Sequence, residues 1–256
     1  MVIDLTQFER GDAFSGDYHA SLSALQQRLA RLQIAQIVHR KRALIIFEGW
    51  MCAGKKAALK RLVASWDPCH LSTHCVGGAD RSDDDRHWLA PFWSALPPAG
   101  DTAIFYRSWY RRLIDDRASG KTDTKRWARA CDEINEFEAQ QRDHGTLIVK
   151  LFFHVSAEQQ QVRFRERQAD PWRRHLFDAQ QLPSSEERER TTLALNDMFE
   201  ATDTRWAPWR VIDANDKQAS RIAALTFLVE AFEKAIPAEP PKTGDTVVAF
   251  PNQKSA

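Results

Sequence analysis

Cysteine is scarce in this chain of 256 residues, and long apolar runs are missing. The four cysteines form no Cys-x-x-Cys pair, which argues against a disulfide scaffold and favours reduced thiols. No apolar stretch approaches the length of a membrane span or of a signal core, so we expect a cytoplasmic protein with no membrane partner. The formal net charge is only +1, which argues against a general DNA- or RNA-binding protein.

Two short pairs, Cys69-His70 and His74-Cys75, contain residue types that bind zinc. All four side chains lie in one segment of seven residues that spans a predicted strand, where tetrahedral coordination of one ion is difficult. Side chains that alternate along a strand are therefore the preferred interpretation.

A phosphate-binding motif follows the first apolar run of the chain. Residues 43–48 predict a buried parallel strand, and the Gly-x4-Gly-Lys pattern from Gly49 to Lys55 after it is typical of a P-loop. Gly49 and Gly54 would let backbone amides approach an anion, while the Lys55 ammonium would bind phosphate at a helix N-terminus. The next residue is Lys56, whereas a P-loop usually has a magnesium-binding serine or threonine there.

Strand and helix patterns alternate along the rest of the chain. This alternation predicts an α/β protein with a doubly wound parallel sheet, a P-loop kinase of three α/β/α layers with a helical lid. We expect an N-terminal helical extension over 1–40, a P-loop domain over 41–236 with its lid at about 163–185, and a mobile tail over 237–256. Helices are predicted over 17–39, 55–66, 83–96, 123–141, 157–168, 184–201 and 220–235, and further strands over 71–76, 102–106, 146–155 and 209–213.

Basic residues gather in two segments beyond the P-loop. One runs from Arg107 to Arg129, directly after a predicted strand, where ligands of open α/β sheets bind. The other runs from Arg163 to Arg174, on a helix and the loop that follows it. Both suit a substrate with many phosphates, and the second could close over a transferring phosphoryl group. A solvated helix with internal ion pairs is the alternative.

Many short motifs, in order, make the chain resemble the polyphosphate kinase type 2 family. Besides the P-loop, they are Lys60-Arg61-Leu62 with Asp67-Pro68, Leu96-Pro97 with Gly100, Arg107-Ser108-Trp109-Tyr110, Glu158-Gln159 with Arg163-Phe164, Asp170-Pro171, Thr202-Asp203-Thr204, Ala207-Pro208-Trp209 and Asp213 to Lys217. The Pro91-Phe92-Trp93 motif and residues 107–112 are most similar to its polyphosphate:AMP phosphotransferase branch.

The resemblance implies phosphoryl transfer between inorganic polyphosphate and a nucleoside mono- or diphosphate such as AMP or ADP, with Mg²⁺. It implies catalytic roles for Lys55 and Arg107. The phosphate-binding residues that we expect are Gly49, Gly54, Lys55, Lys56, Arg111, Arg112, Arg163, Arg167, Arg173 and Arg174. A homo-oligomer is among the alternatives for its assembly.

Two acidic positions of the family pattern are replaced in this chain. Met51 stands in the P-loop where the family has aspartate, and Tyr106 stands before the Arg107 motif where it has another. Neither a thioether nor a phenol is a good magnesium ligand at neutral pH, so we expect impaired catalysis. The alternatives are a non-catalytic polyphosphate- or nucleotide-binding partner of a complete homologue, and a different P-loop kinase.

Overall fold

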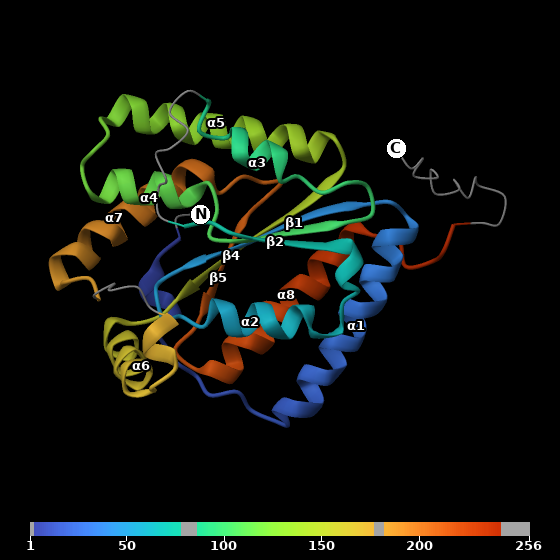
Figure 1. Cartoon of the computed structure of the whole chain (residues 1–256), viewed down its shortest axis with the longest axis horizontal. Coiled ribbons are helices and arrows are strands. Elements are labelled where there is room, and N and C mark those ends of the chain that lie inside the picture. Colours follow the sequence, from blue (N-terminus) through green and yellow to red (C-terminus); the bar gives the residue numbers. More distant parts are fainter. Residues whose placement is uncertain (1–2, 78–85, 177–181, 242–256) are drawn as a thin grey trace.

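A parallel sheet of five strands forms the middle of the molecule. The computed structural model describes residues 3–77, 86–176 and 182–241. The strands follow the order β2-β3-β1-β4-β5, and every neighbouring pair is parallel (Figure 1). Their bounds are Arg42–Gly49 (β1), Leu71–Cys75 (β2), Thr102–Tyr106 (β3), Thr146–His154 (β4) and Trp209–Asp213 (β5).

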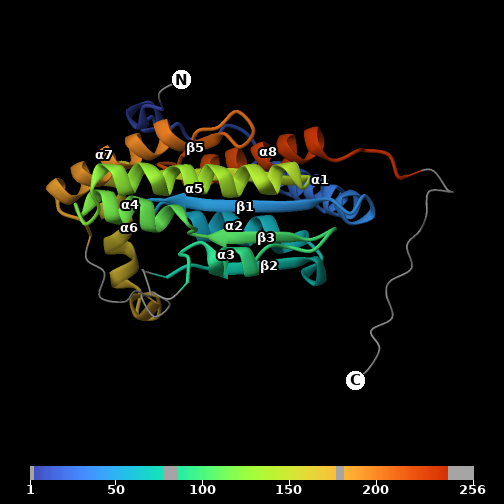
Figure 2. The ribbon, with the colours of Figure 1, turned by 90° about the horizontal axis from the view of Figure 1, so that it is seen from above.

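Helices cover both faces of this sheet, which confirms the predicted doubly wound α/β architecture. One face carries α1 (Tyr18–Val38), α2 (Lys55–Leu62) and α8 (Lys217–Ala235), which contact one another. The other carries α4 (Tyr110–Ala118), α5 (Thr124–Asp143) and α7 (Ser185–Thr202), and the short α3 (Ala90–Ser94) lies near α5 (Figures 1 and 2). α6 (Ala157–Ala169) follows β4. Single 3-10 turns are η1 (Leu5–Phe8), η2 (Val63–Ser65), η3 (Pro68–His70) and η4 (Arg173–Leu176).

The apolar runs of the sequence explain the core. All six side chains from Ala43 to Glu48 of β1 are buried, and β4 is almost as completely enclosed. Strands that are buried on both faces are expected where helices cover both sides of a parallel sheet. Because β1 lies between β3 and β4, the loop that follows it opens at the middle of the carboxyl edge of the sheet.

Several predicted boundaries were wrong. Within the described residues, the helix predicted over 83–96 is reduced to α3, because Pro91 is tolerated only near a helix start and residues 88–89 form a turn. Residues 83–85 lie outside the described residues, as do 177–181 of the predicted lid and 242–256 of the predicted tail. Helix α4 was not predicted, since its basic residues were interpreted as a phosphate-binding segment.

The helix starts were predicted better, because capping side chains mark them. Ser184 accepts a hydrogen bond from the Glu187 amide, and the Glu187 carboxylate accepts one from the Ser184 amide, which completes a capping box for α7. Helix α8 is an exception, because the predicted start at Ser220 was wrong: Asp216 accepts hydrogen bonds from the amides of Gln218 and Ala219, and the helix begins at Lys217.

Candidate functional site

The loop from Gly49 to Gly54 connects β1 to α2 and has an unusual backbone. Gly49 has a φ of +131° and Gly54 a φ of +94°, a range that favours glycine. Cys52 is also left-handed, at a φ of +65°, which costs a non-glycine residue about 1–2 kcal/mol. Helix α2 begins at Lys55, so the loop ends at a helix N-terminus, where free amides and the helix dipole favour an anion.

Lys55 is buried inside this loop with 4% of its surface exposed. Its Nζ donates hydrogen bonds to the carbonyl oxygens of Gly49, at 2.6 Å, and Trp50, at 2.8 Å. Burial lowers the pKa of Lys55 to about 7; the nearby Glu48 carboxylate opposes this shift, and the Arg107 and Arg111 guanidinium groups add to it. A bound anion would therefore stabilise the charged form of Lys55.

The ends of β1 and β3 are tied together beside Lys55. Glu48, the penultimate residue of β1, accepts hydrogen bonds from the Ser108 amide at 2.7 Å and the Ser108 hydroxyl at 2.9 Å. Burial raises the pKa of Glu48 despite these donors and the charge of Lys55. The Tyr106 ring lies 5.8 Å from the Lys55 Nζ, and Arg107 has a left-handed backbone with a φ of +63°. The site thus combines several cations with one buried carboxylate.

The predicted arginines of the first basic segment separate into two groups. Arg107 and Arg111 lie close enough to Lys55 for their charges to lower its pKa. Arg112 instead lies 5.7 Å from the ring centre of Trp88 and pairs with Asp116 at 3.5 Å. It therefore belongs to the neighbouring groove.

The second basic segment reaches the P-loop through α6. Arg163 is 4% exposed and donates hydrogen bonds to the backbone carbonyls of Cys52 and Asn215, while Arg167 donates to the Cys52 Sγ at 3.4 Å. Arg173 pairs with Asp170 at 3.1 Å, and Arg174 is exposed in η4. Lys56 is exposed in the first turn of α2. Their phosphate-binding roles stay predictions.

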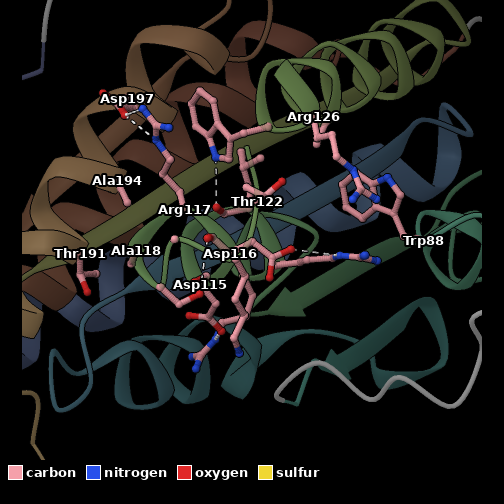
Figure 3. A pocket seen from close by; sticks show the side chains of 18 of the residues that line it. Trp88, Asp115, Asp116, Arg117, Ala118, Thr122, Arg126, Thr191, Ala194 and Asp197 are labelled. Carbon is pink, nitrogen blue, oxygen red and sulfur yellow. Dashed lines mark hydrogen bonds and ion pairs between the residues drawn. The ribbon is translucent and has the colours of Figure 1, made fainter. Parts of the chain in front are cut away.

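Helices α4, α5 and α7 contribute to the lining of an open groove of about 2590 Å³, and Arg111 is among its lining residues. Figure 3 shows this groove from close by. Nine arginines and lysines and five aspartates and glutamates line the groove. This local excess of positive charge is larger than the formal net charge of +1 of the whole chain. Some of these charges are paired, such as Arg117 with Asp197 at 2.8 Å. Lys121, Lys125 and Arg126 are exposed along the same groove. The groove thus has a local excess of positive charge that would attract polyanions, and Arg111 links it to Lys55 of the P-loop.

Comparison with known proteins agrees with this arrangement. A family model described as Polyphosphate kinase 2 (PPK2) matches residues 13–240. The chain belongs to the polyphosphate kinase 2 family. It is 33% identical, over 88% of its length, to the polyphosphate:AMP phosphotransferase of Acinetobacter johnsonii, and 31% identical, over 84%, to ADP-polyphosphate phosphotransferase 2 of Rhizobium meliloti (strain 1021).

The extent of these matches differs. The chain spans 47% of the Acinetobacter relative but 70% of the Rhizobium one. Among solved structures, polyphosphate kinase 2 from Arthrobacter aurescens TC1 superposes with a TM-score of 0.81 at 27% identity, covering 96% of this chain and 88% of that chain. The described helices are too short or too polar to span a membrane.

Polyphosphate kinase 2 enzymes generally require Mg²⁺, and the described residues around this P-loop do not fit a protein-held magnesium ion. Magnesium needs oxygen ligands, usually one or two carboxylates together with water and phosphate. Here Glu48 is the nearby carboxylate, and one of its oxygens already accepts two hydrogen bonds from Ser108. Met51 and Tyr106 offer a thioether and a phenol, and no three histidine, cysteine, aspartate or glutamate side chains converge within residues 3–77, 86–176 and 182–241.

Sequence patterns missed the side chains that support the loop from outside. The Trp50 Nε1 donates to the His154 Nδ1 at 2.9 Å, and the His154 Nε2 lies 2.8 Å from a Glu9 carboxylate oxygen. Gln160 and Arg188 contact the loop from α6 and α7. Nothing in the spacing of these residues indicates the contacts, because they join segments far apart in the chain.

The shifted pKa of Lys55 predicts a pH dependence of phosphate binding. Because this pKa is about 7, Lys55 is charged below that pH and must take up a proton to bind an anion above it. Arginine stays charged throughout. The affinity of the wild-type protein for tripolyphosphate, divided by that of Lys55→Arg, should therefore fall as the pH rises from about 6 to about 9. Calorimetric titrations measure this ratio, and a constant ratio would show that Lys55 does not titrate there.

Proposed function

We propose that this chain is a phosphotransferase of reduced catalytic power that acts between inorganic polyphosphate and a nucleoside mono- or diphosphate. The P-loop that presents Lys55 at the centre of the sheet edge supports this function, because the loop combines a helix N-terminus with a buried lysine. The relatives are named for transfer to or from AMP, ADP and GDP, which supports a nucleotide as the second substrate.

The neighbouring groove supports polyphosphate as the other substrate. A chain of many phosphates needs positive charge over a longer distance than one P-loop provides. Arg111, which pairs with Asp115, lies at both the P-loop and the groove, so a polyanion bound to the loop could extend into the groove toward Lys121, Lys125 and Arg126. Binding of DNA or RNA is not part of the proposal, since the chain as a whole carries a formal charge of only +1.

We expect reduced catalytic power because the residues around the P-loop are poor metal ligands. As phosphates approach each other their charges repel, and a metal held by oxygen ligands offsets that repulsion. With Met51 and Tyr106 beside Lys55, Arg107 and Arg111, this chain provides cations for ground-state binding but little support for a metal. Chemistry should therefore be weakened more than binding.

A coupled assay tests this proposal. ADP or ATP formation from AMP or ADP, polyphosphate and Mg²⁺ should be slow in the wild-type protein. It should rise at least about 100-fold in Met51→Asp/Tyr106→Asp, because restored carboxylates could hold the metal. Lys55→Ala is the control that should abolish turnover. A wild-type protein that turns over as fast as the double variant would contradict reduced catalysis.

A non-catalytic binding partner of a complete homologue is the second candidate. Lys55 donates hydrogen bonds to the carbonyls of its own loop, an arrangement that supports phosphate binding without requiring turnover. Tripolyphosphate binding by wild type, together with silence of both proteins in the assay, would favour this candidate. Absence of both binding and turnover would remove both.

A further inference from the structure

Two carbonyl groups of the P-loop accept hydrogen bonds from side chains of α6. The Met51 carbonyl accepts one from the Gln160 Nε2 at 3.0 Å, and the Cys52 carbonyl accepts one from the Arg163 Nη1 at 3.3 Å. These carbonyls belong to the peptides on either side of Cys52, the loop residue with a left-handed backbone. Such a conformation persists in a non-glycine residue only where its surroundings hold it.

The Gln160 donor is itself fixed from α7. Gln160 is 3% exposed, and its Oε1 accepts a hydrogen bond from the Arg188 Nη1 at 2.6 Å, so its amide nitrogen must face Met51. Arg188 also donates to the Val155 carbonyl, and its guanidinium lies 4.1 Å from the ring centre of Trp50. The amide of Gln160 is therefore held in one orientation by groups outside the loop.

Arg163 is held from two sides by hydrogen bonds, and only 4% of its surface is exposed. Its Nη1 donates to Cys52 and its Nη2 donates to the Asn215 carbonyl at 2.6 Å. The Nε is buried and has no hydrogen-bond partner within the described residues. A phosphate ligand on α6 would instead present its Nη groups to the anion, as bidentate arginines do.

We propose that Gln160 and Arg163 are positioning residues that hold the left-handed turn at Cys52 and thereby direct the P-loop amides toward a bound phosphate. This inference rests on the proposed phosphate binding and assigns Arg163 a different role from the predicted direct contact. Gln160 is neutral and holds the loop as Arg163 does, so holding the Cys52 turn does not require a charged side chain.

Substitutions of both residues test the inference through binding of sodium tripolyphosphate. Gln160→Met and Arg163→Met should each weaken binding about tenfold, whereas Arg165→Met, an exposed arginine on the same helix, should leave it unchanged. Adding Cys52→Gly to Arg163→Met should recover part of the loss, because glycine adopts the left-handed backbone without a clamp. Thermal unfolding of each variant verifies that it remains folded.

The salt dependence of binding separates positioning from direct contact. The neutral Gln160→Met variant removes no charge and should lower affinity by the same factor at every salt concentration, whereas loss of a direct phosphate contact in Arg163→Met would flatten the decline of affinity with salt more than Arg165→Met does. A flattened decline in Arg163→Met, without recovery by Cys52→Gly, would overturn the inference and establish Arg163 as a phosphate ligand.

Hydrogen exchange of the ligand-free protein tests the clamp without any phosphate. Amides of the peptide covering residues 49–56 should exchange faster in Gln160→Met and Arg163→Met than in wild type or Arg165→Met. Unchanged exchange would overturn the inference. A wild-type protein that fails to bind tripolyphosphate would contradict the proposed function, while the exchange rates would still decide whether the clamp exists.

Discussion

Replacing Gly49 with alanine should destabilise the protein by about 4 kcal/mol or more, or prevent folding. A Cβ at this position would lie 2.2 Å from the carbonyl oxygen and 2.6 Å from the amide nitrogen of Phe153. Both atoms belong to the backbone of β4, which is hydrogen-bonded to strands on both sides and cannot withdraw. The positive φ of Gly49 adds strain to the clash.

Gly54 offers a matched control within the same loop. Its φ is +94°, but a Cβ would meet no atom within 4 Å, so Gly54→Ala should cost only the backbone strain of about 1–3 kcal/mol. Urea unfolding of the two variants measures the difference. Equal destabilisation would mean that strain, and not the contact with β4, requires glycine at both ends of the loop.

Replacing Lys150 with methionine should cost about 3–5 kcal/mol, because it strands a buried carboxylate. Lys150 and Glu138 are fully buried and pair at 3.0 Å, and Lys150 also donates to the Tyr110 hydroxyl and the Thr202 carbonyl. Burial lowers the pKa of Lys150, against the attraction of Glu138. Without the ammonium, Glu138 would keep only the neutral donors Tyr110 and Trp109.

Two control variants test whether the unpaired Glu138 carboxylate causes the loss of stability in Lys150→Met. Lys150→Met combined with Glu138→Gln should cost less than Lys150→Met alone, since no unpaired charge remains. Arg28→Met, which breaks the exposed pair with Glu233, should cost less than about 1 kcal/mol. A double variant as unstable as the single one would show that packing, and not the stranded charge, causes the loss.

The sequence predicted the fold well where local chemistry decides it. An unbroken apolar strand before a Gly-x4-Gly-Lys loop placed the P-loop, and side-chain caps such as Ser184 marked helix starts correctly. The sequence failed where a local rule was overlooked, as with Pro91 inside a predicted helix. It also failed at α4, whose arginines and aspartates pair along the helix and conceal its short apolar stripe of Leu113 and Ile114.

Sequence patterns could not predict which groups a side chain contacts. Spacing could assign Arg163 to a helix near the site, but the groups it binds, at Cys52 and Asn215, lie 111 and 52 residues away. A motif of charges cannot distinguish an arginine that faces an anion from one that supports the loop around it. The buried Lys150 illustrates the same limit, because its place in an apolar strand gave no sign of the Glu138 partner on α5.

The middle position of β1 makes the P-loop a reporter of the whole fold. The strand extends into the loop with β3 on one side and β4 on the other, so the loop cannot open alone without disturbing the interior of the sheet. A phosphate compound bound there would raise the stability of the entire domain by mass action. Thermal melting of the intact protein can therefore rank polyphosphates and nucleotides as ligands, even when no turnover is measurable.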